Sequence, residues 1–377
     1  MIKTDQNIKA FCSYPFQRLK CTPEGDITMC CFHERKCLGN ILKSSLEDIW
    51  FSPLAEEIRE ETLKGSLHKT CQVDSCPFFK RKNLELQEFK QRKYPQEFEI
   101  DLPNQHCNIG GEVPSLKNPA CIMCERHHRD PKEFYQQDHL EEICGKLKPY
   151  MKYAKWLHVQ GVAEPFWKDR IFEILEWLGV PEHKEQVWIS TTTNGTLMNE
   201  RHRKMFLEYP KSTITWSMDA GSPEIYKIIR RVDMFEKIVE NMKSYSNERN
   251  RNGQYIHIHN NINTINIVDV EKMVRLAAAV GIDRLDFNAT YGVPSICVNH
   301  ENVHIFYEAQ KEIMILARQL GVFATFMRDL TLDIAVPPTV EEIFEEMNRR
   351  RITRIEEKSM IQIELPSKAL VQLELPK

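Results

Sequence analysis

The chain has 377 residues, 42% of them hydrophobic, and a formal net charge of −3 at pH 7, which fits a globular protein of about two or three domains. It lacks the basic excess of a nucleic-acid-binding protein, and its N-terminus lacks the apolar run of a signal peptide or a membrane helix. We therefore expect a cytoplasmic protein that binds neither nucleic acid nor membrane, of an oligomeric state that the sequence does not determine. Twelve cysteines in a reducing compartment indicate metal binding before disulfides.

Residues 1–80 are unusually rich in cysteine. The segment contains seven, namely Cys12, Cys21, Cys30, Cys31, Cys37, Cys71 and Cys76. A region of this size buries only a modest core, so we expect metal to hold it together. Residues 22–29 predict a hairpin that turns at Glu24-Gly25-Asp26 and brings Cys30 or Cys31 close to Cys12.

A helix is expected after the hairpin. Ser44 or Ser45 suits its start and Gly65 its end, and the residues between them that repeat at helical spacing are Ile49, Trp50, Leu54, Ile58 and Leu63. This helix returns the chain to the last two cysteines of the segment. The expected four-ligand set is Cys12, Cys30, Cys71 and Cys76, with Cys31 an alternative to Cys30. Four thiolates suit an iron–sulfur cluster or a structural zinc ion. A second auxiliary cluster, in which Cys21, Cys37 and a cysteine of the barrel join Cys31, also remains open.

Residues 81–96 predict a charged linker helix, and residues 97–325 alternate short apolar strands with amphipathic helices, which is typical of a parallel α/β fold. The expected strands cover 98–102, 156–160, 187–192, 214–218, 255–259 and 284–288. The expected helices include 170–178, 234–245 and 270–279. Six such units are too few for a closed eight-unit barrel.

Three cysteines, Cys107, Cys121 and Cys124, follow the first of these strands. A cubane cluster held by three thiolates keeps one iron open to another ligand, and a metal with an open position is typical of catalysis. The alternatives are a structural zinc site and buried thiols that bind no metal.

The loops at the C-terminal ends of strands build the active sites of α/β barrels. Strand two is followed by Gly161-Val-Ala-Glu164, strand three ends in Thr193-Asn194-Gly, and strand four ends in Ser217-Met-Asp219, with Arg230 further on. A glycine lets a ligand approach the backbone, and a carboxylate accepts hydrogen bonds from an ammonium group. Each segment also reads as an ordinary turn.

Two segments resemble the cluster motif of radical S-adenosylmethionine (SAM) enzymes. Cys107-Asn108 matches the front of that motif and Cys121-Ile-Met-Cys124 its back, with about ten extra residues between the two parts. The resemblance implies a partial (β/α)6 TIM-like barrel and a [4Fe–4S] cluster bound by Cys107, Cys121 and Cys124. It implies SAM contacts at Gly161, Ala163, Glu164, Thr193, Asn194, Ser217, Asp219 and Arg230.

The N-terminal cysteine segment resembles the SPASM/twitch auxiliary-cluster domain through Cys12-Ser-Tyr-Pro, Cys30-Cys31, Leu38-Gly-Asn and Cys71-x4-Cys76-Pro. In that family the domain usually follows the barrel, whereas here it precedes it. The resemblance implies at least one auxiliary [4Fe–4S] cluster that passes electrons or holds the fold together. The expected domains are therefore 1–80, the linker 81–96, the barrel 97–325 and a C-terminal extension 326–377, which reads as a helix followed by a hairpin.

The family mechanism is reductive cleavage of SAM to methionine and a 5′-deoxyadenosyl radical, which abstracts hydrogen from the substrate; flavodoxin or ferredoxin is the expected electron donor. Relatives with auxiliary clusters mostly modify ribosomal peptides or protein side chains, by oxidation, crosslinking or epimerisation, and we expect such a substrate. The alternatives are a dehydrogenase of a small sugar or cyclitol and, outside enzymes, a cysteine-rich zinc-binding interaction protein. Cys297 and Tyr291, on the loop after strand six, are candidate hydrogen donors; Cys297 also suits a second cluster or simple packing.

Overall fold

A computed structural model of the protein describes residues 12–30, 37–66, 68–71, 93–103, 121–123, 138–161, 163–290, 295–297 and 303–326. All of them belong to the first of two compact units, residues 1–337, and the second unit is residues 338–377. Cys31, Cys76, Cys107, Cys124 and Tyr291 lie outside the described residues, as do most of the expected linker 81–96 and nearly all of the extension 326–377. None of the described helices is long and apolar enough to cross a membrane.

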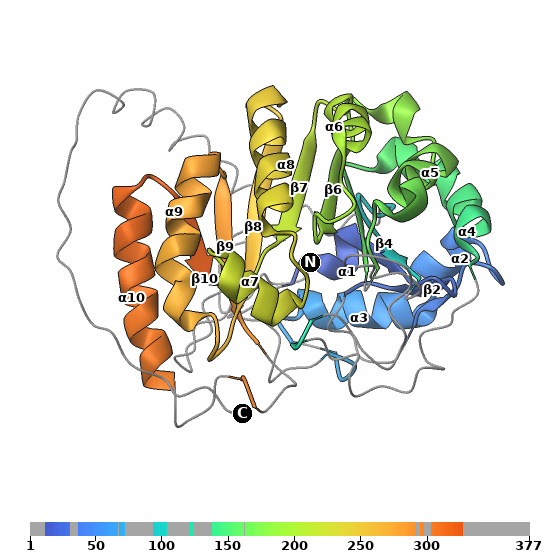
Figure 1. Ribbon diagram of the computed structural model, residues 1–377. Helices are drawn as coiled ribbons and strands as arrows, with labels where there is room; N and C mark the ends of the chain where they lie inside the picture. Colours follow the sequence, from blue (N-terminus) through green and yellow to red (C-terminus); the bar gives the residue numbers. More distant parts are fainter. Residues whose placement is uncertain are drawn as a thin grey trace. The chain divides into compact units, whose positions relative to one another are not determined.

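The strands of the described residues form one ten-stranded sheet in the order β10-β9-β8-β7-β6-β5-β4-β1-β2-β3 (Figure 1). The strands are β1 (Arg18–Cys21), β2 (Asp26–Thr28), β3 (Gly39–Asn40), β4 (Glu97–Leu102), β5 (Trp156–Gly161), β6 (Trp188–Thr193), β7 (Ser212–Ser217), β8 (Gln254–Ile262), β9 (Arg284–Ala289) and β10 (Phe323–Phe326). Every pairing from β1–β4 across to β9–β10 is parallel, and the pairings β1–β2 and β2–β3 are antiparallel.

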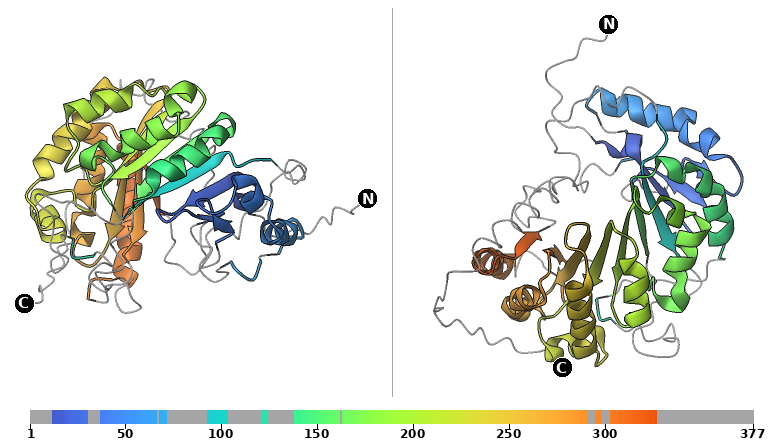
Figure 2. Two further views of the ribbon diagram at one scale, coloured as in Figure 1. Left: turned by 90° about the vertical axis from the view of Figure 1, so that its right-hand side faces the viewer. Right: turned by 90° about the horizontal axis from the view of Figure 1, so that it is seen from above.

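Helices line the outer side of the curved sheet (Figure 2). The helices that the structure describes are α1 (Tyr14–Gln17), α2 (Leu46–Trp50), α3 (Pro53–Leu63), α4 (Leu140–Leu147), α5 (Arg170–Trp177), α6 (Glu200–Leu207), α7 (Pro223–Arg230), α8 (Phe235–Glu248), α9 (Val270–Val280) and α10 (Val303–Gln319), with 3₁₀ turns η4 (Lys148–Tyr153), η5 (Trp167–Asp169), η6 (Val180–His183) and η7 (Ile267–Asp269). The six expected strands are all present as β4 to β9. The sequence pattern missed β10, a short strand that extends the sheet beyond β9.

The core lies between the sheet and these helices. Alternate residues of each strand point into it, for example Leu157 and Val159 of β5 and Leu285 and Phe287 of β9, all fully buried. Their neighbours along each strand, such as His158 and Asp286, therefore face the opposite side, which we call the inner face of the sheet.

The N-terminal segment folds as expected at the hairpin and differently at the helix. Strands β1 and β2 pair around Gly25, whose φ of +86° is the left-handed conformation that glycine adopts without strain. The single helix expected from Ser44 or Ser45 to Gly65 is wrong, because the structure has two helices, α2 and α3. Ser52 caps α3 through a hydrogen bond from the Ala55 backbone N–H, and Pro53 begins that helix, so the chain restarts there.

Strand β1 joins the N-terminal segment directly to the barrel sheet by parallel pairing with β4. On the inner face, Lys20 Nζ lies 2.9 Å from Glu99 Oε1 and 2.8 Å from Asp101 Oδ2, and Arg18 also pairs with Glu99. Although burial opposes ionisation of Glu99, these two cations hold the pKa of that carboxyl well below its usual range. The two segments thus share one sheet and one charged network.

Candidate functional site

The buried carboxylate of Glu164 lies just past the C-terminal end of β5. It is 2% exposed and accepts hydrogen bonds from Thr193 Oγ1 at 2.5 Å and from the Asn194 backbone N–H at 2.9 Å. Burial raises the pKa of Glu164 to about 7, against the lowering effect of these hydrogen bonds. Arg230 also acts to lower this pKa, but Glu164 forms no ion pair with a described residue, so its charge is left for a cationic ligand to neutralise.

Gly161, the last residue of β5, lies against the backbone of β4. A side-chain carbon placed on it would lie 2.7 Å from the Leu102 backbone nitrogen, and its φ is +150°. Only glycine fits this approach without strain. Ala163, the next expected contact, is half-buried and packs at the edge of the core beside Glu164. The ends of β4 and β5 are therefore held close together where the sequence predicts a bound cofactor.

Arg230, at the end of α7, contacts residues at the C-terminal end of β7 and just beyond it. Its guanidinium donates to the Ser217 carbonyl oxygen at 2.9 Å and to Ser217 Oγ at 2.8 Å, and it forms an ion pair with Asp219. Asp219 is fully buried and also accepts from the Asn261 backbone N–H at 2.8 Å. The expectation that Ser217 and Asp219 face one site is consistent with this shared contact.

Cys121 is the one proposed ligand of the barrel cluster within the described residues, and it lies beside Arg230. Arg230 Nη1 donates to Cys121 Sγ at 3.4 Å, and Cys121 is 7% exposed. The adjacent Ile122 N–H donates to the carbonyl oxygen of Ile229 in α7 at 3.0 Å. Cys121 and Ile122 are thus anchored to the end of α7, where Ser217 and Asp219 are also bound.

Four asparagines crowd the end of β8, and the structure separates their roles. The backbone N–H of Asn263 donates to Asn266 Oδ1, and the backbone N–H of Asn266 donates to Asn263 Oδ1. Asn266 Nδ2 also donates to the Asp219 carbonyl oxygen at 2.8 Å. Asn260 Nδ2 donates to the Met218 carbonyl oxygen. Asn261 lies on the inner face. Three of the four therefore shape the loop, and Asn261 is the one at the inner surface.

The three described members of the proposed auxiliary set, Cys12, Cys30 and Cys71, are half-buried, and the fourth, Cys76, lies outside the described residues. Within the part of the chain that the structure describes, no group of three or more His, Cys, Asp or Glu residues is placed to hold a metal ion. The ligand set therefore stays a prediction. Cys21 and Cys144 are fully buried in the hydrophobic core, so their thiols pack as small apolar groups.

Cys297 is half-buried, in a short described segment at residues 295–297. Its neighbour Ile296 accepts a hydrogen bond from the backbone N–H of Thr264, which follows β8. The segment therefore lies beside the C-terminal end of β8. Its competitor as hydrogen donor, Tyr291, lies outside the described residues.

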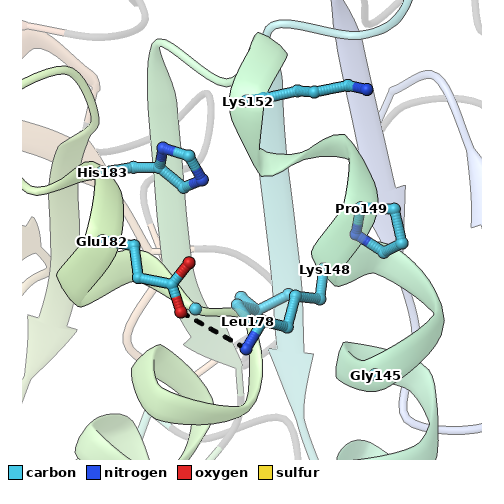
Figure 3. Close-up of a pocket in the computed structure, with 8 residues that line it drawn as sticks. Gly145, Lys148, Pro149, Lys152, Leu178, Glu182 and His183 are labelled. Carbon is cyan, nitrogen blue, oxygen red and sulfur yellow. Dashed lines mark ion pairs between the residues drawn. The ribbon is translucent and has the colours of Figure 1, made fainter.

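A cavity of about 440 Å³ lies elsewhere in the molecule, and Figure 3 shows the residues that line it. It is lined by Gly145, Lys148, Pro149, Lys152, Leu178, Gly179, Glu182 and His183. These residues belong to the end of α4, to η4, to the residues that follow α5 and to η6, which precede the N-terminal ends of β5 and β6. The cavity is therefore distinct from the site at the strand C-terminal ends.

Strand periodicity also carries a signal for residues beyond the expected site. Gln160, His259 and Asn288 face the inner side of the sheet, and none was among the expected site residues. Strands buried on both faces read as continuous apolar runs. The alternation Tyr-Ile-His-Ile-His-Asn-Asn at 255–261 departs from that pattern and marks a polar inner face.

The residues present fit a cationic cofactor and a cluster at this edge of the sheet. Glu164 offers a buried carboxylate to an ammonium group. Cys121 offers a sulfur next to a cation, a surrounding that favours the thiolate that iron requires.

Two family models match the chain. Residues 12–77 match the iron–sulfur cluster-binding domain SPASM, and residues 118–277 match the radical SAM superfamily. The order of the two matches confirms that the SPASM segment precedes the radical SAM segment. A search of the curated proteins found no match.

Among solved structures, Streptococcus suis SuiB bound to its precursor peptide SuiA is 15% identical with a TM-score of 0.48, and the match covers 80% of this chain and 68% of that one. Native anSMEcpe with bound AdoMet is 18% identical with a TM-score of 0.45, and the match covers 62% and 64%. A radical SAM methyltransferase from Sphaerobacter thermophilus is 11% identical with a TM-score of 0.41, and the match covers 58% and 64%. In the match to SuiB bound to S-adenosylmethionine, this chain spans 57% of the length of the SuiB chain.

Proposed function

We propose that this chain, which carries a radical SAM domain preceded by an iron–sulfur SPASM domain, abstracts hydrogen from a side chain of a ribosomal peptide or protein and so modifies it. Cys107, Cys121 and Cys124 would hold the barrel cluster, and residues at the ends of β5, β6 and β7 would hold SAM. When bound, the cluster and SAM supply a one-electron cleavage that yields methionine and a hydrogen-abstracting 5′-deoxyadenosyl group.

The observation that carries this proposal is that Arg230 contacts Cys121, pairs with Asp219 and acts electrostatically on the buried Glu164, all at one edge of the sheet. Glu164 would accept the ammonium group of SAM, because a buried carboxylate without an ion-pair partner favours a bound cation. Gly161 and Ala163 would leave their backbone open to the same group. Asn194, Thr193 and Ser217 would bind the organic part of the ligand.

The protein's own residues do three things in this scheme. Arg230 fixes Cys121 relative to the strand ends through charge-assisted hydrogen bonds. The Thr193 hydroxyl and the Asn194 N–H hold Glu164 in one orientation. The apolar core behind the sheet keeps these polar groups rigid, so that the substrate C–H bond meets its reactant in a fixed geometry.

The peptide substrate is a proposal that draws on proteins of similar domain composition. SuiB has been captured with a precursor peptide, and the SPASM segment adds clusters that suit oxidative chemistry. The inner face of the sheet favours one alternative, a small sugar or cyclitol, because its polar residues suit hydroxyl groups. A flavodoxin or ferredoxin would supply the electron in either case.

The test is anaerobic reconstitution with iron and sulfide, followed by reduction with dithionite in the presence of SAM. Formation of 5′-deoxyadenosine supports the proposal, and its absence from a protein that holds the expected iron contradicts it. Glu164→Gln and Ser217→Ala should each weaken SAM binding by about ten- to a hundredfold, since a hydrogen bond to a charged group contributes roughly 1.5–3 kcal/mol. Unchanged affinity in both variants would remove these residues from the site.

A further inference from the structure

The last inner-facing residue of each barrel strand from β4 to β9 is polar. These residues are Asp101, Gln160, Thr192, Ser217, Asn261 and Asn288. The residues on the other face at the same strand ends include Leu102, Val159, Trp216 and Ile262, all buried against the helices. The C-terminal end of the barrel interior is therefore lined by hydrogen-bonding groups rather than by apolar ones.

Asp101, the one charged residue of this set, is already paired. Asp101 lies 2.8 Å from Lys20, which also pairs with Glu99. Further along the sheet, Arg284 Nε lies 2.5 Å from Asp286 Oδ1. A charged group that entered between these strands would have to break one of these pairs or stay without a counter-ion, and both are costly in a buried setting.

The uncharged groups keep spare hydrogen-bonding capacity. The hydroxyls of Thr192 and Thr215 form no hydrogen bond with a described residue, and Asn288 uses its Nδ2 on His259 at 2.6 Å while its Oδ1 has no such partner. His257 is buried, and its Nε2 likewise has no partner among the described residues. Burial lowers the pKa of His257 to about 4, so this ring is neutral at physiological pH.

An aromatic row lies at the N-terminal ends of the same strands. Trp156 and Trp188 stack with their rings 5.4 Å apart, and Trp188 and Tyr255 stack at 5.3 Å. The indole N–H groups of the two tryptophans donate to the hydroxyls of Ser190 and Thr213. The polar groups therefore lie between this aromatic row and the strand ends where Glu164 and Cys121 lie.

We propose that the group of the substrate that enters the barrel interior is neutral and rich in hydroxyl or amide groups, and this inference rests on the proposed function. An apolar group would strip water from Thr192, Thr215 and Asn288 without replacing its hydrogen bonds, and each polar group left unsatisfied in this way weakens binding. A hydroxyl or carboxamide replaces them. This chemistry occurs in a serine, threonine or asparagine side chain of a peptide and in a sugar or cyclitol ring.

The test uses the reconstituted protein with SAM, dithionite and carbon-deuterated probes, and measures the deuterium carried by 5′-deoxyadenosine. The probes are myo-inositol and N-acetylated, C-amidated Gly-X-Gly peptides in which X is serine, asparagine, leucine, phenylalanine, lysine or glutamate. We expect at least about tenfold more deuterium from serine, asparagine or inositol than from the other four, which corresponds to about 1.4 kcal/mol. Transfer from inositol alone identifies a small polyol, and transfer from the peptides alone identifies a side chain.

Equal or greater transfer from leucine, phenylalanine, lysine or glutamate overturns the inference, and so does undeuterated 5′-deoxyadenosine with every probe. A protein that forms no 5′-deoxyadenosine at all overturns the proposed function itself, so the two failures are distinguishable. Asn288→Leu should cut the deuterated fraction obtained with the best polar probe about tenfold and raise the share from leucine. The matched change Asn247→Leu, at an exposed position of α8, should alter neither; equal effects of the two variants also count against the inference.

Discussion

Arg230 donates a hydrogen bond to the sulfur of Cys121 at 3.4 Å across 109 residues of sequence. The same guanidinium binds Ser217 and Asp219, so one buried cation joins Cys121 to residues at the C-terminal end of β7 and just beyond it. A cation and an N–H donor at a cluster sulfur stabilise the reduced cluster, which is the more negative state.

Arg230→Met should therefore make the reduction potential of the barrel cluster more negative. The measurement is a redox titration followed by the electron paramagnetic resonance signal that changes when SAM is added. Arg230→Lys keeps a positive charge, so its reduction potential should lie closer to that of the wild type than the potential of Arg230→Met does. Arg231→Met changes the exposed neighbouring arginine and serves as control; a potential for Arg230→Met equal to that of the control would show that the contact has no electronic role.

Replacement of Cys107, Cys121 and Cys124 together by alanine should abolish SAM cleavage and leave the iron of the N-terminal segment in place. The reason is that the three thiolates are proposed to hold one cluster and Cys12, Cys30, Cys71 and Cys76 another. Iron analysis and 5′-deoxyadenosine formation with dithionite measure the two effects. Continued formation of 5′-deoxyadenosine by the triple variant would refute the cluster assignment.

The affinity for SAM should rise with pH through the titration of Glu164. Burial raises the pKa of Glu164 to about 7, and only the ionised carboxylate pairs with an ammonium group. Affinity should therefore be weak near about pH 6 and increase toward about pH 8. Equilibrium binding across this range measures it. Glu164→Gln should bind more weakly and lose most of this rise, whereas the same rise in that variant would assign the titration to another group.

The stability of the SAM-free protein should show the opposite trend at Glu164. A raised pKa means that the folded state holds the proton more tightly than the unfolded state. The stability that this group contributes is complete below its unfolded pKa, about 4.3, and is lost as pH rises through about 7. Denaturant unfolding measures the free energy of unfolding of the wild type and of Glu164→Gln. As pH rises, the variant should gain stability relative to the wild type. A difference that stays constant with pH would contradict the raised pKa.

Asp219→Ala should destabilise the fold because it leaves Arg230 buried without its counter-ion; the side chains are 0% and 6% exposed. Removal of one partner of a buried pair costs about 3–5 kcal/mol. Asp233→Ala is the matched control, since Asp233 and Lys227 form an exposed pair with side chains 74% and 63% accessible, and such pairs contribute about 0–1 kcal/mol. Urea unfolding compares the two, and similar losses would mean that the Asp219–Arg230 pair is not buried in solution.

Cys297→Ala should allow 5′-deoxyadenosine formation while the yield of modified substrate falls, if the thiol acts after hydrogen abstraction. The half-buried position of Cys297 beside the end of β8 is compatible with this role. Product analysis by mass spectrometry measures it once a substrate is in hand. A normal product yield would assign Cys297 to packing.

Much of the fold was predictable from short-range signals. The six barrel strands, the hairpin at Gly25 and the helices that became α5, α8 and α9 follow from periodicity and turn residues, because each signal depends on a few neighbouring residues. The break between α2 and α3 was also visible, in Ser52-Pro53, and was missed because the apolar repeat continues across it.

The sequence by itself determined which chemistry-bearing residues lie at strand ends, since strand alternation and the cysteine spacing are local properties. Only the tertiary structure decided which of them meet. The contact of Arg230 with Cys121, the pairing of β1 with β4, and the separation of Asn261 from its three neighbours all depend on strand order and register. Register is set by the packing of whole sheet faces against helices, so no short stretch of sequence specifies it.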